Sequence, residues 1–343
     1  MIEVKKAHEL DIVELTEDLP EYGLLKGAKG TVVEVFDKPE EAYMIEFLED
    51  LGATSKIADW VKPSQIKNID TIAREIYTRG MAHLQQGNYI EAAREIRQAA
   101  ELIPSYVRGL HESFGQTLAP IEDWPRLIAA MHFVRLIDPN YEFAKNNLAI
   151  AYLNYGVQEA NKGNYEDSIQ LFQSALRIES PSDVESIIKE NIATSHTVLG
   201  IQSYKKGDFP LTVKHLEAAY TFNPNERTRH DLGVAYFHMA MLCVSKGDLQ
   251  RAITYYQWAE DAGLMLPEVL NNHACALADN GEVEEAILRL ESAQALAPKD
   301  ESIRSNLSKL LNAKTPVDFI TEEIQEEFSP ISPMNVVRLS AAA

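Results

Sequence analysis

The chain has 343 residues, of which 45% are hydrophobic, which is enough for a packed core. No apolar run approaches the roughly 18 residues that a membrane-spanning helix needs, so a membrane-spanning protein is not expected. The 32 Lys and Arg against 52 Asp and Glu give a net charge of −20. Because nucleic-acid binders neutralise phosphates, this charge disfavours nucleic acid and favours basic or neutral partners.

The N-terminus and the cysteines indicate the cellular setting. The first residues contain no apolar segment of the kind that directs secretion. The two cysteines, Cys243 and Cys275, are too few for a disulfide framework, so we expect a cytoplasmic protein in which both thiols pack in the core.

Residues 1–68 are predicted to form a small β domain. Residues 11–15, 30–36 and 42–47 alternate between apolar and polar side chains, and the second run is rich in β-branched residues. Turn residues separate these runs. Four or five short strands in this length predict a small barrel or a curled sheet.

A five-fold helical repeat follows from residue 71 onward. Each copy has a glycine, then Asn, Asp or Glu, then a large apolar residue; the five turn glycines are Gly87, Gly163, Gly207, Gly247 and Gly281. A small residue stands seven places before each glycine, a large apolar residue nine places after it, and an alanine twelve places after it. We expect each glycine to close a turn between antiparallel helices, with the residue after it starting the next helix. The two later positions are expected to fill the seam with the next hairpin.

This pattern resembles the tetratricopeptide (TPR) repeat, a helical hairpin of about 34 residues, over residues 71–313. A sixth, degenerate hairpin is predicted around Gly115 and Asp123, and the first helices at about 141–161, 183–206 and 225–246 are expected to be lengthened. Residues 301–313 are predicted to be a capping helix. The resemblance implies an α+β multidomain chain, with a small N-terminal β-barrel followed by an all-α, TPR-like superhelical solenoid of about six hairpins.

The N-terminal stretch has a resemblance of its own. Residues 18–27, followed by the Gly-Thr-Val-Val-Glu-Val run at 30–35, are similar to a small bacterial domain family of unknown function with an SH3-like appearance. The resemblance covers about residues 9–68 and implies a compact strand-rich module.

The sequence contains no motif typical of catalysis or of metal binding. No phosphate-binding glycine loop, metalloprotease helix or nucleophile elbow occurs. His230 and His238 are separated by about two helical turns, but they lack a carboxylate at metal-ligand spacing, so we expect ordinary surface or seam histidines. The sequence therefore predicts no enzyme activity, no metal and no cofactor.

The TPR resemblance also implies a concave groove lined by the first helix of each hairpin. The positions that face the groove in TPR proteins are largely apolar and aromatic here, which suits an amphipathic helix or an extended peptide. Carried over onto this sequence, the predicted groove residues are Arg74, Tyr77, Met81, Leu84, Thr197, Ile201, Tyr204, Phe237, Met241 and Asn271. The Lys, Arg and Asn set with which some TPR domains hold a C-terminal carboxylate is largely missing, so that mode is not expected.

The C-terminal tail, residues 314–343, is predicted to contain a short amphipathic acidic helix. Thr315 and Pro316 form a typical helix start, and Val317, Ile324 and Phe328 follow at helical spacing together with Ile320. We expect this apolar stripe to dock on the last repeat or to be offered to a partner. Partial filling of the groove by the protein itself is the alternative.

These observations favour a non-enzymatic scaffold or adaptor that binds a peptide or helix of a partner protein in the groove, with the β domain as a second contact module. Two alternatives stay open. One is a regulatory or immunity-type factor that occludes a partner enzyme, and the other is an RNA-associated factor acting through the β domain.

Overall fold

The computed structural model of the chain describes residues 6–48, 55–312, 319, 321–325 and 327–337. The chain folds as two compact units, which we call unit 1, within residues 1–148, and unit 2, within residues 149–338.

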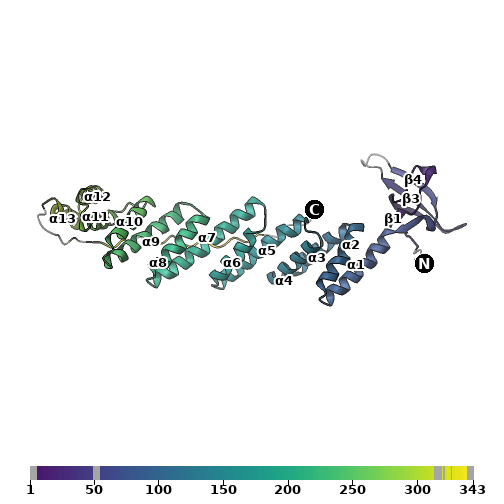
Figure 1. Ribbon diagram of the computed structural model, residues 1–343, viewed down its shortest axis with the longest axis horizontal. Helices are drawn as coiled ribbons and strands as arrows, with labels where there is room; N and C mark the ends of the chain where they lie inside the picture. Colours follow the sequence, from purple (N-terminus) through teal and green to yellow (C-terminus); the bar gives the residue numbers. More distant parts are fainter. Residues whose placement is uncertain (1–5, 49–54, 313–318, 320, 326, 338–343) are drawn as a thin grey trace. The chain divides into compact units, whose positions relative to one another are not determined.

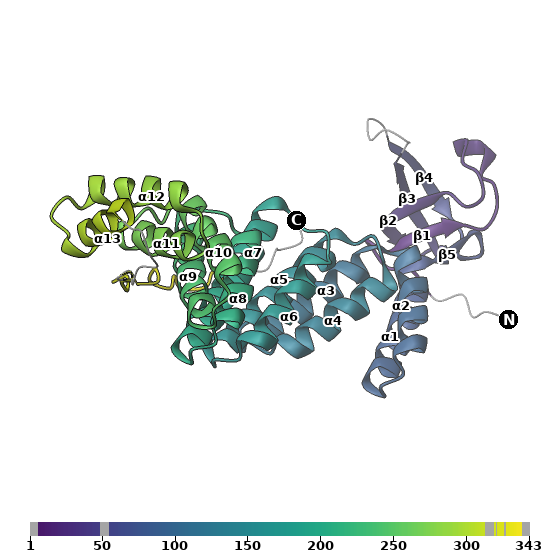
Figure 2. The same ribbon diagram turned by 60° about the vertical axis from the view of Figure 1, so that its left-hand side comes forward.

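Unit 1 begins with a five-stranded antiparallel sheet (Figure 2). Its strands are β1 (Ile12–Leu15), β2 (Lys29–Phe36), β3 (Ala42–Leu48), β4 (Ser55–Val61) and β5 (Ile66–Asn68), with short 3-10 helices at Pro20–Tyr22 and Pro63–Gln65. The strand order is β4-β3-β2-β1-β5, and β2 carries a bulge between Val32 and Glu34 against β3. The predicted strands are therefore confirmed, while closure of the sheet into an SH3-like barrel stays a prediction.

The sheet has its own hydrophobic core. Val13, Val32 and Ile45 are fully buried, and Tyr43 and Phe47 pack beside them. Residues two apart face this core in β1 and β5, as the period-two pattern of a half-buried sheet requires, whereas the buried residues of β4, Ala58 and Val61, are three apart where its pairing with β3 shifts register.

Two helical hairpins complete unit 1. Their helices are α1 (Ile69–Gln85), α2 (Tyr89–Leu102), α3 (Ser105–Leu118) and α4 (Trp124–Ile137). Asp123 accepts a hydrogen bond from the backbone N–H of Arg126 and so caps α4. The predicted degenerate hairpin is thus confirmed as α3 and α4.

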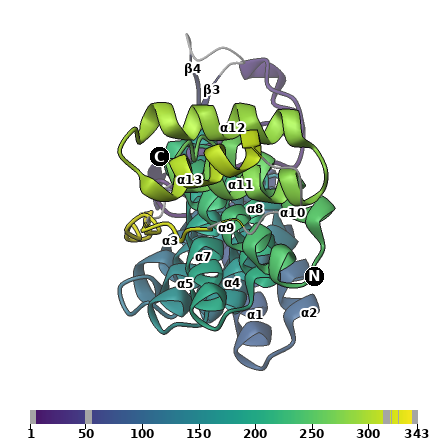
Figure 3. The same ribbon diagram turned by 90° about the vertical axis from the view of Figure 1, so that its left-hand side faces the viewer.

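Unit 2 consists of further hairpins and a final helix, which follow one another side by side (Figures 1 and 3). The helices are α5 (Glu142–Asn161), whose residues up to Leu148 belong to unit 1, α6 (Tyr165–Leu176), α7 (Ser182–Lys205), α8 (Phe209–Phe222), α9 (Glu226–Ser245), α10 (Leu249–Asp261), α11 (Pro267–Asp279), α12 (Val283–Leu296) and α13 (Glu301–Asn312). Helices α5, α7 and α9 contain 20, 24 and 20 residues, so the predicted lengthening is confirmed. The helix predicted at residues 301–313 is present as α13, and its role as a cap stays a prediction. In the described residues, no helix is long and apolar enough to cross a membrane.

The turn glycines behave as predicted. All five have φ between 73° and 89°, a region that residues with a Cβ rarely adopt. The residue after the glycine is the N-cap of the second helix in each case, but only the aspartates, Asp208 and Asp248, accept a backbone hydrogen bond with their side chains.

The helix seams confirm the predicted close packing at the alanines and show an additional contact within each hairpin. The alanines twelve places after the turn glycines are at most 1% exposed, as close packing requires. The large residue nine places after the glycine packs against the small residue of its own hairpin, and Tyr256, one of the five, also stacks on His273 of α11 in the next hairpin. A Cβ on Gly156 would lie 2.5 Å from the ring of Phe172, and one on Gly80 would lie 2.7 Å from Ile96. The small residue therefore leaves the space that the large side chain of the same hairpin fills.

Candidate functional site

The C-terminal tail lies along the first helices of unit 2 as an extended segment. None of the described tail residues, 319, 321–325 and 327–337, is helical, so the predicted amphipathic helix is wrong for them. Its expected start at Thr315 and Pro316 lies outside the described residues, as do Val317 and Ile320. The tail, yellow in Figures 1 and 3, passes α11, α9 and α7 and reaches α5, which is the reverse of their order in the sequence.

Asparagine side chains hold the backbone of this tail. Asn191 on α7 accepts from the N–H of Asn335 at 3.0 Å and donates to the C=O of the same residue at 2.8 Å. Asn154 on α5 makes the same pair with Val337, at 3.0 and 2.8 Å. A carboxamide has one acceptor and one donor side by side, so it matches the N–H and C=O of one extended residue.

The same arrangement recurs on α11 and, in modified form, on α9. Asn272 accepts from the N–H of Glu322 at 2.8 Å and donates to its C=O. Asp231 on α9 accepts from the N–H of Ser329 at 2.8 Å. We call the surface that carries Asn154, Asn191, Asp231 and Asn272 the docking face.

A buried asparagine network supports the docking face behind α11. Asn306 on α13 donates to Asn271 at 2.8 Å, and Asn271 donates to Asn272 at 3.3 Å. All three are at most 1% exposed. Buried polar groups of this kind are costly unless they are satisfied, so the network fixes the orientation of the amide that meets the tail.

Aromatic contacts supplement the backbone pairs. The ring of Phe328 lies 4.9 Å from that of Tyr204 in an edge-to-face arrangement, and the hydroxyl of Tyr204 lies 3.0 Å from Nε2 of His238. Ile324 is 9% exposed and joins the apolar core around α8 to α10. Burial lowers the pKa of His238 and raises that of Tyr204, so both are uncharged near neutral pH.

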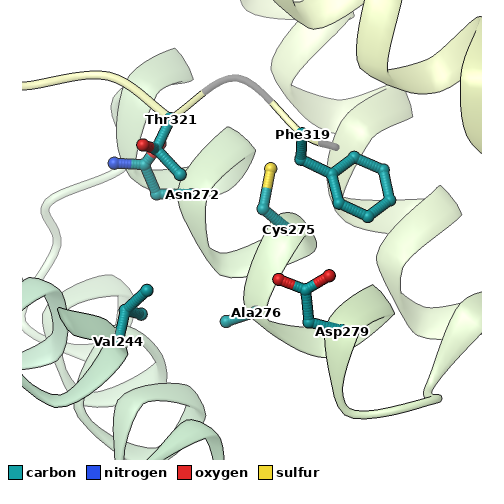
Figure 4. A pocket seen from close by; sticks show the side chains of 7 residues that line it. All are labelled: Val244, Asn272, Cys275, Ala276, Asp279, Phe319 and Thr321. Carbon is teal, nitrogen blue, oxygen red and sulfur yellow. The ribbon is translucent and has the colours of Figure 1, made fainter. Parts of the chain in front are cut away.

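A cavity of about 240 Å³ lies where the tail meets α9 and α11 (Figure 4). Its lining consists of Val244, Asn272, Cys275, Ala276, Asp279, Phe319 and Thr321. Burial raises the pKa of the Cys275 thiol to about 12, so this thiol is protonated and is not a nucleophile at neutral pH. Cys243 is also buried, in agreement with the expected packing role.

The structure places the predicted groove residues in three settings. Arg74, Tyr77, Met81 and Leu84 lie on α1 in unit 1, where Tyr77 stacks on Tyr106 with ring centroids 4.4 Å apart.

In unit 2, Tyr204 contacts the tail directly, while Ile201 and Met241 are half-buried. Thr197, Phe237 and Asn271 are at most 3% exposed and face the interior of the solenoid, ten places before their turn glycines.

The residues that hold the tail were missed by sequence reasoning, which considered the neighbouring positions. Asn154 and Asn272 stand nine places before their turn glycines, and Asn191 and Asp231 stand sixteen places before theirs. Nine and sixteen differ by seven residues, close to two helical turns, so these positions lie on one face of the first helix. Recurrent Asn or Asp at these offsets is the sequence signal that could have identified the docking face.

The histidines do not form a metal site in the part of the chain that the structure describes, where no group of three or more His, Cys, Asp or Glu side chains is placed to hold an ion. His196 and His215 face each other with their Nδ1 atoms 3.1 Å apart. Burial, together with His215, lowers the pKa of His196 to about 4.

Family models match segments in both the sheet domain and the helical part of the chain. Residues 9–67 match a family described as Domain of unknown function (DUF4926). Residues 73–106 and 239–301 match models of the tetratricopeptide repeat. No curated protein matches the chain.

Several solved structures are similar to the chain at low identity. The TPR domain of P58(IPK) is 10% identical with a TM-score of 0.30, and the match covers 70% of this chain and 64% of that domain. The TPR2AB-domain:pHSP90 complex of yeast Sti1 is 14% identical with a TM-score of 0.28, covering 70% of this chain and 97% of the other. For Pseudomonas aeruginosa pilF the identity is 17% and the TM-score 0.26, with 70% and 99% covered. These TM-scores are too low to say anything about function. The chain thus has an N-terminal region that matches DUF4926 and forms a small strand-rich sheet domain, followed by a TPR-like helical solenoid in which two segments match the tetratricopeptide repeat.

Proposed function

We propose that the chain is a non-enzymatic scaffold whose docking face binds an extended segment of a partner protein. Tetratricopeptide repeats support a protein–protein interaction scaffold. The observation that carries the proposal is the pairing of Asn154, Asn191 and Asn272 with the backbone of an extended chain.

The geometry of the pairs favours an extended peptide over an amphipathic helix. In a helix, the N–H and C=O groups are already bonded to each other along the helix, so they are not offered to a neighbouring amide. An extended chain presents both groups of one residue on the same side, where a carboxamide fits them. Recognition of this kind depends on the peptide backbone, and side-chain contacts such as that between Tyr204 and Phe328 add sequence preference.

Because the tail already occupies the docking face, a partner must displace it. A tethered segment has an effective concentration in the millimolar range for short flexible links. A partner segment therefore succeeds only when it binds more tightly than the tail or when the tail is released. We infer that the tail regulates access to the docking face.

The N-terminal sheet is proposed as a second contact module. Several large apolar side chains on its surface support this role; Leu25, Leu48 and Ile57 are more than half exposed, and Trp60 is 41% exposed. Exposed apolar groups of this size are typical of interaction surfaces when they gather in a patch.

A peptide titration on a tail-released full chain tests the proposed function. Proline at positions 322, 329, 335 and 337 removes the four tail N–H groups that the docking face accepts, and we call this protein the tail-released variant. A fluorescent peptide with the sequence of residues 319–337 should bind this variant, and should bind the unmodified chain at least tenfold more weakly because the tail competes. A chain ending at residue 312 serves as the second tail-free protein. Absence of binding to both proteins, with helical content and thermal midpoint intact, would contradict the proposal.

A further inference from the structure

One of the four tail contacts is incomplete. Asp231 is 0% exposed, and its Oδ1 accepts the N–H of Ser329 at 2.8 Å. Its Oδ2 is also buried and receives no hydrogen bond from any described residue. Nδ1 of His230 lies 3.7 Å from Oδ1, which is beyond hydrogen-bond distance. The tail therefore donates a hydrogen bond to only one of the two carboxylate oxygens.

The comparison with the other three contacts shows what is missing. At Asn154, Asn191 and Asn272, the second atom of the side chain is an amide nitrogen that donates to the tail C=O. A carboxylate has no proton to donate, so Asp231 cannot complete this pair. Burying a carboxylate oxygen that receives no hydrogen bond costs free energy, because the oxygen loses its hydrogen bonds to water and forms no new ones.

The basic side chain that reaches the tail from α9 does not supply the missing donor. Arg227 lies one helical turn before Asp231, and it donates through Nη1 to the hydroxyl of Ser332 at 2.7 Å. Arg227 thus holds the tail three residues further along. The carboxylate of Asp231 is left for a group that the tail does not provide.

We propose that the docking face is selective for an extended partner segment that carries Lys or Arg beside Asp231, at the place taken by Ser329 of the tail. This inference rests on the proposed function and adds the chemistry of the partner. A basic side chain would give Oδ2 a charge-assisted hydrogen bond, which is stronger than a neutral one. The net charge of −20 also favours the approach of a basic segment. The tail of this chain is then a weaker occupant that keeps the docking face covered until such a segment arrives.

Three peptides and one substitution test the selectivity. The peptides have the sequence of residues 319–337, the same sequence with Ser329→Lys, and the same sequence with Ser332→Lys. Each is titrated against the tail-released variant with Asp231 intact and with Asp231→Asn. The Ser332→Lys peptide is the matched control, because it carries the same charge but places it against Arg227.

The expected result is a specific coupling between position 329 and Asp231. The Ser329→Lys peptide should bind about tenfold or more tightly than the parent peptide when Asp231 is intact. The Ser332→Lys peptide should bind more weakly than the parent. With Asp231→Asn, the advantage of Ser329→Lys should fall to twofold or less, and the parent peptide should bind more tightly, because the new amide can donate to a tail carbonyl.

Two outcomes overturn the proposal. Either equal gains from both lysine peptides or a gain from Ser329→Lys that persists with Asp231→Asn would show that only general charge attraction acts. In that case binding of the parent peptide still supports the proposed function, and only the selectivity is wrong. Failure of all three peptides to bind overturns the proposed function and this inference together.

Discussion

Replacing Asn191 by alanine should weaken peptide binding by a predictable amount. Asn191 makes two hydrogen bonds to the backbone of one tail residue, Asn335, at 3.0 and 2.8 Å. Each neutral hydrogen bond contributes about 1 kcal/mol net, so the loss is about 2 kcal/mol. This corresponds to an affinity about 30-fold lower.

The assay is fluorescence anisotropy of the labelled 319–337 peptide on the tail-released variant with and without Asn191→Ala. Ser186→Ala is the matched control, because Ser186 is exposed on the same helix and lies about 140° around the helix axis from Asn191. It should leave the affinity unchanged. An affinity for Asn191→Ala within twofold of the parent, at an unchanged thermal midpoint, would refute the reasoning that the amide pairs hold the peptide.

Three further predictions concern the solenoid itself. Gly156→Ala should lower the free energy of unfolding by about 1–3 kcal/mol, because its Cβ would lie 2.5 Å from the ring of Phe172. Gly109→Ala should raise the free energy of unfolding by about 0.5–1 kcal/mol, because its Cβ would have no atom within 4 Å. Urea denaturation measures both variants, and equal effects would contradict the packing account. Asp208→Ala should cost about 1 kcal/mol in the same assay through loss of the α8 cap, and no loss would show that the cap is unimportant. Since burial lowers the pKa of His196 to about 4, below its value of about 6.5 in the unfolded chain, the unfolded state binds more protons between these values. The free energy of unfolding should therefore be highest above about pH 6.5 and should decline as the pH falls toward 4. His196→Phe should make this decline with pH smaller. Thermal melts recorded across this pH range measure both effects.

The repeat architecture could be predicted from the sequence because its causes are local and steric. A glycine at positive φ, a small residue seven places earlier and an alanine twelve places later constrain a hairpin wherever they occur together. The lengthening of α5, α7 and α9 followed from the separations of the turn glycines, and helix α13 followed from its apolar stripe. The contact between the large residue and the small residue of its own hairpin was not predicted, because spacing gives the face of a helix but not which neighbour meets it.

The tail could not be predicted from local pattern. The apolar residues between Val317 and Phe328 have helical spacing, but a helix of this length is marginal in water without tertiary support. The extended form gains backbone hydrogen bonds to Asn191 and Asn154, which lie more than 140 residues away in the sequence. Such long-range contacts outweigh local propensity and are invisible to a periodicity argument.

The docking face was predicted only in part for a related reason. The TPR resemblance placed the groove on the first helices, which is where the tail lies, and Tyr204 contacts Phe328. The lengthening of the first helices adds a further polar position sixteen places before the turn glycine, occupied by Asn191 and Asp231. This offset is not among the groove positions carried over from the TPR pattern, so the family pattern could not point to it.

Residue-resolved amide hydrogen exchange of the tail in the unmodified full chain tests the central claim most directly. The N–H groups of Glu322, Ser329, Asn335 and Val337 should exchange at least about tenfold more slowly than in the free 319–337 peptide, because each donates to a side chain of the docking face. The N–H groups of the exposed residues Ile331 and Val336 should exchange at nearly the free-peptide rate. Free-peptide rates at all six positions would show that the docking face does not hold an extended chain, and would contradict the account.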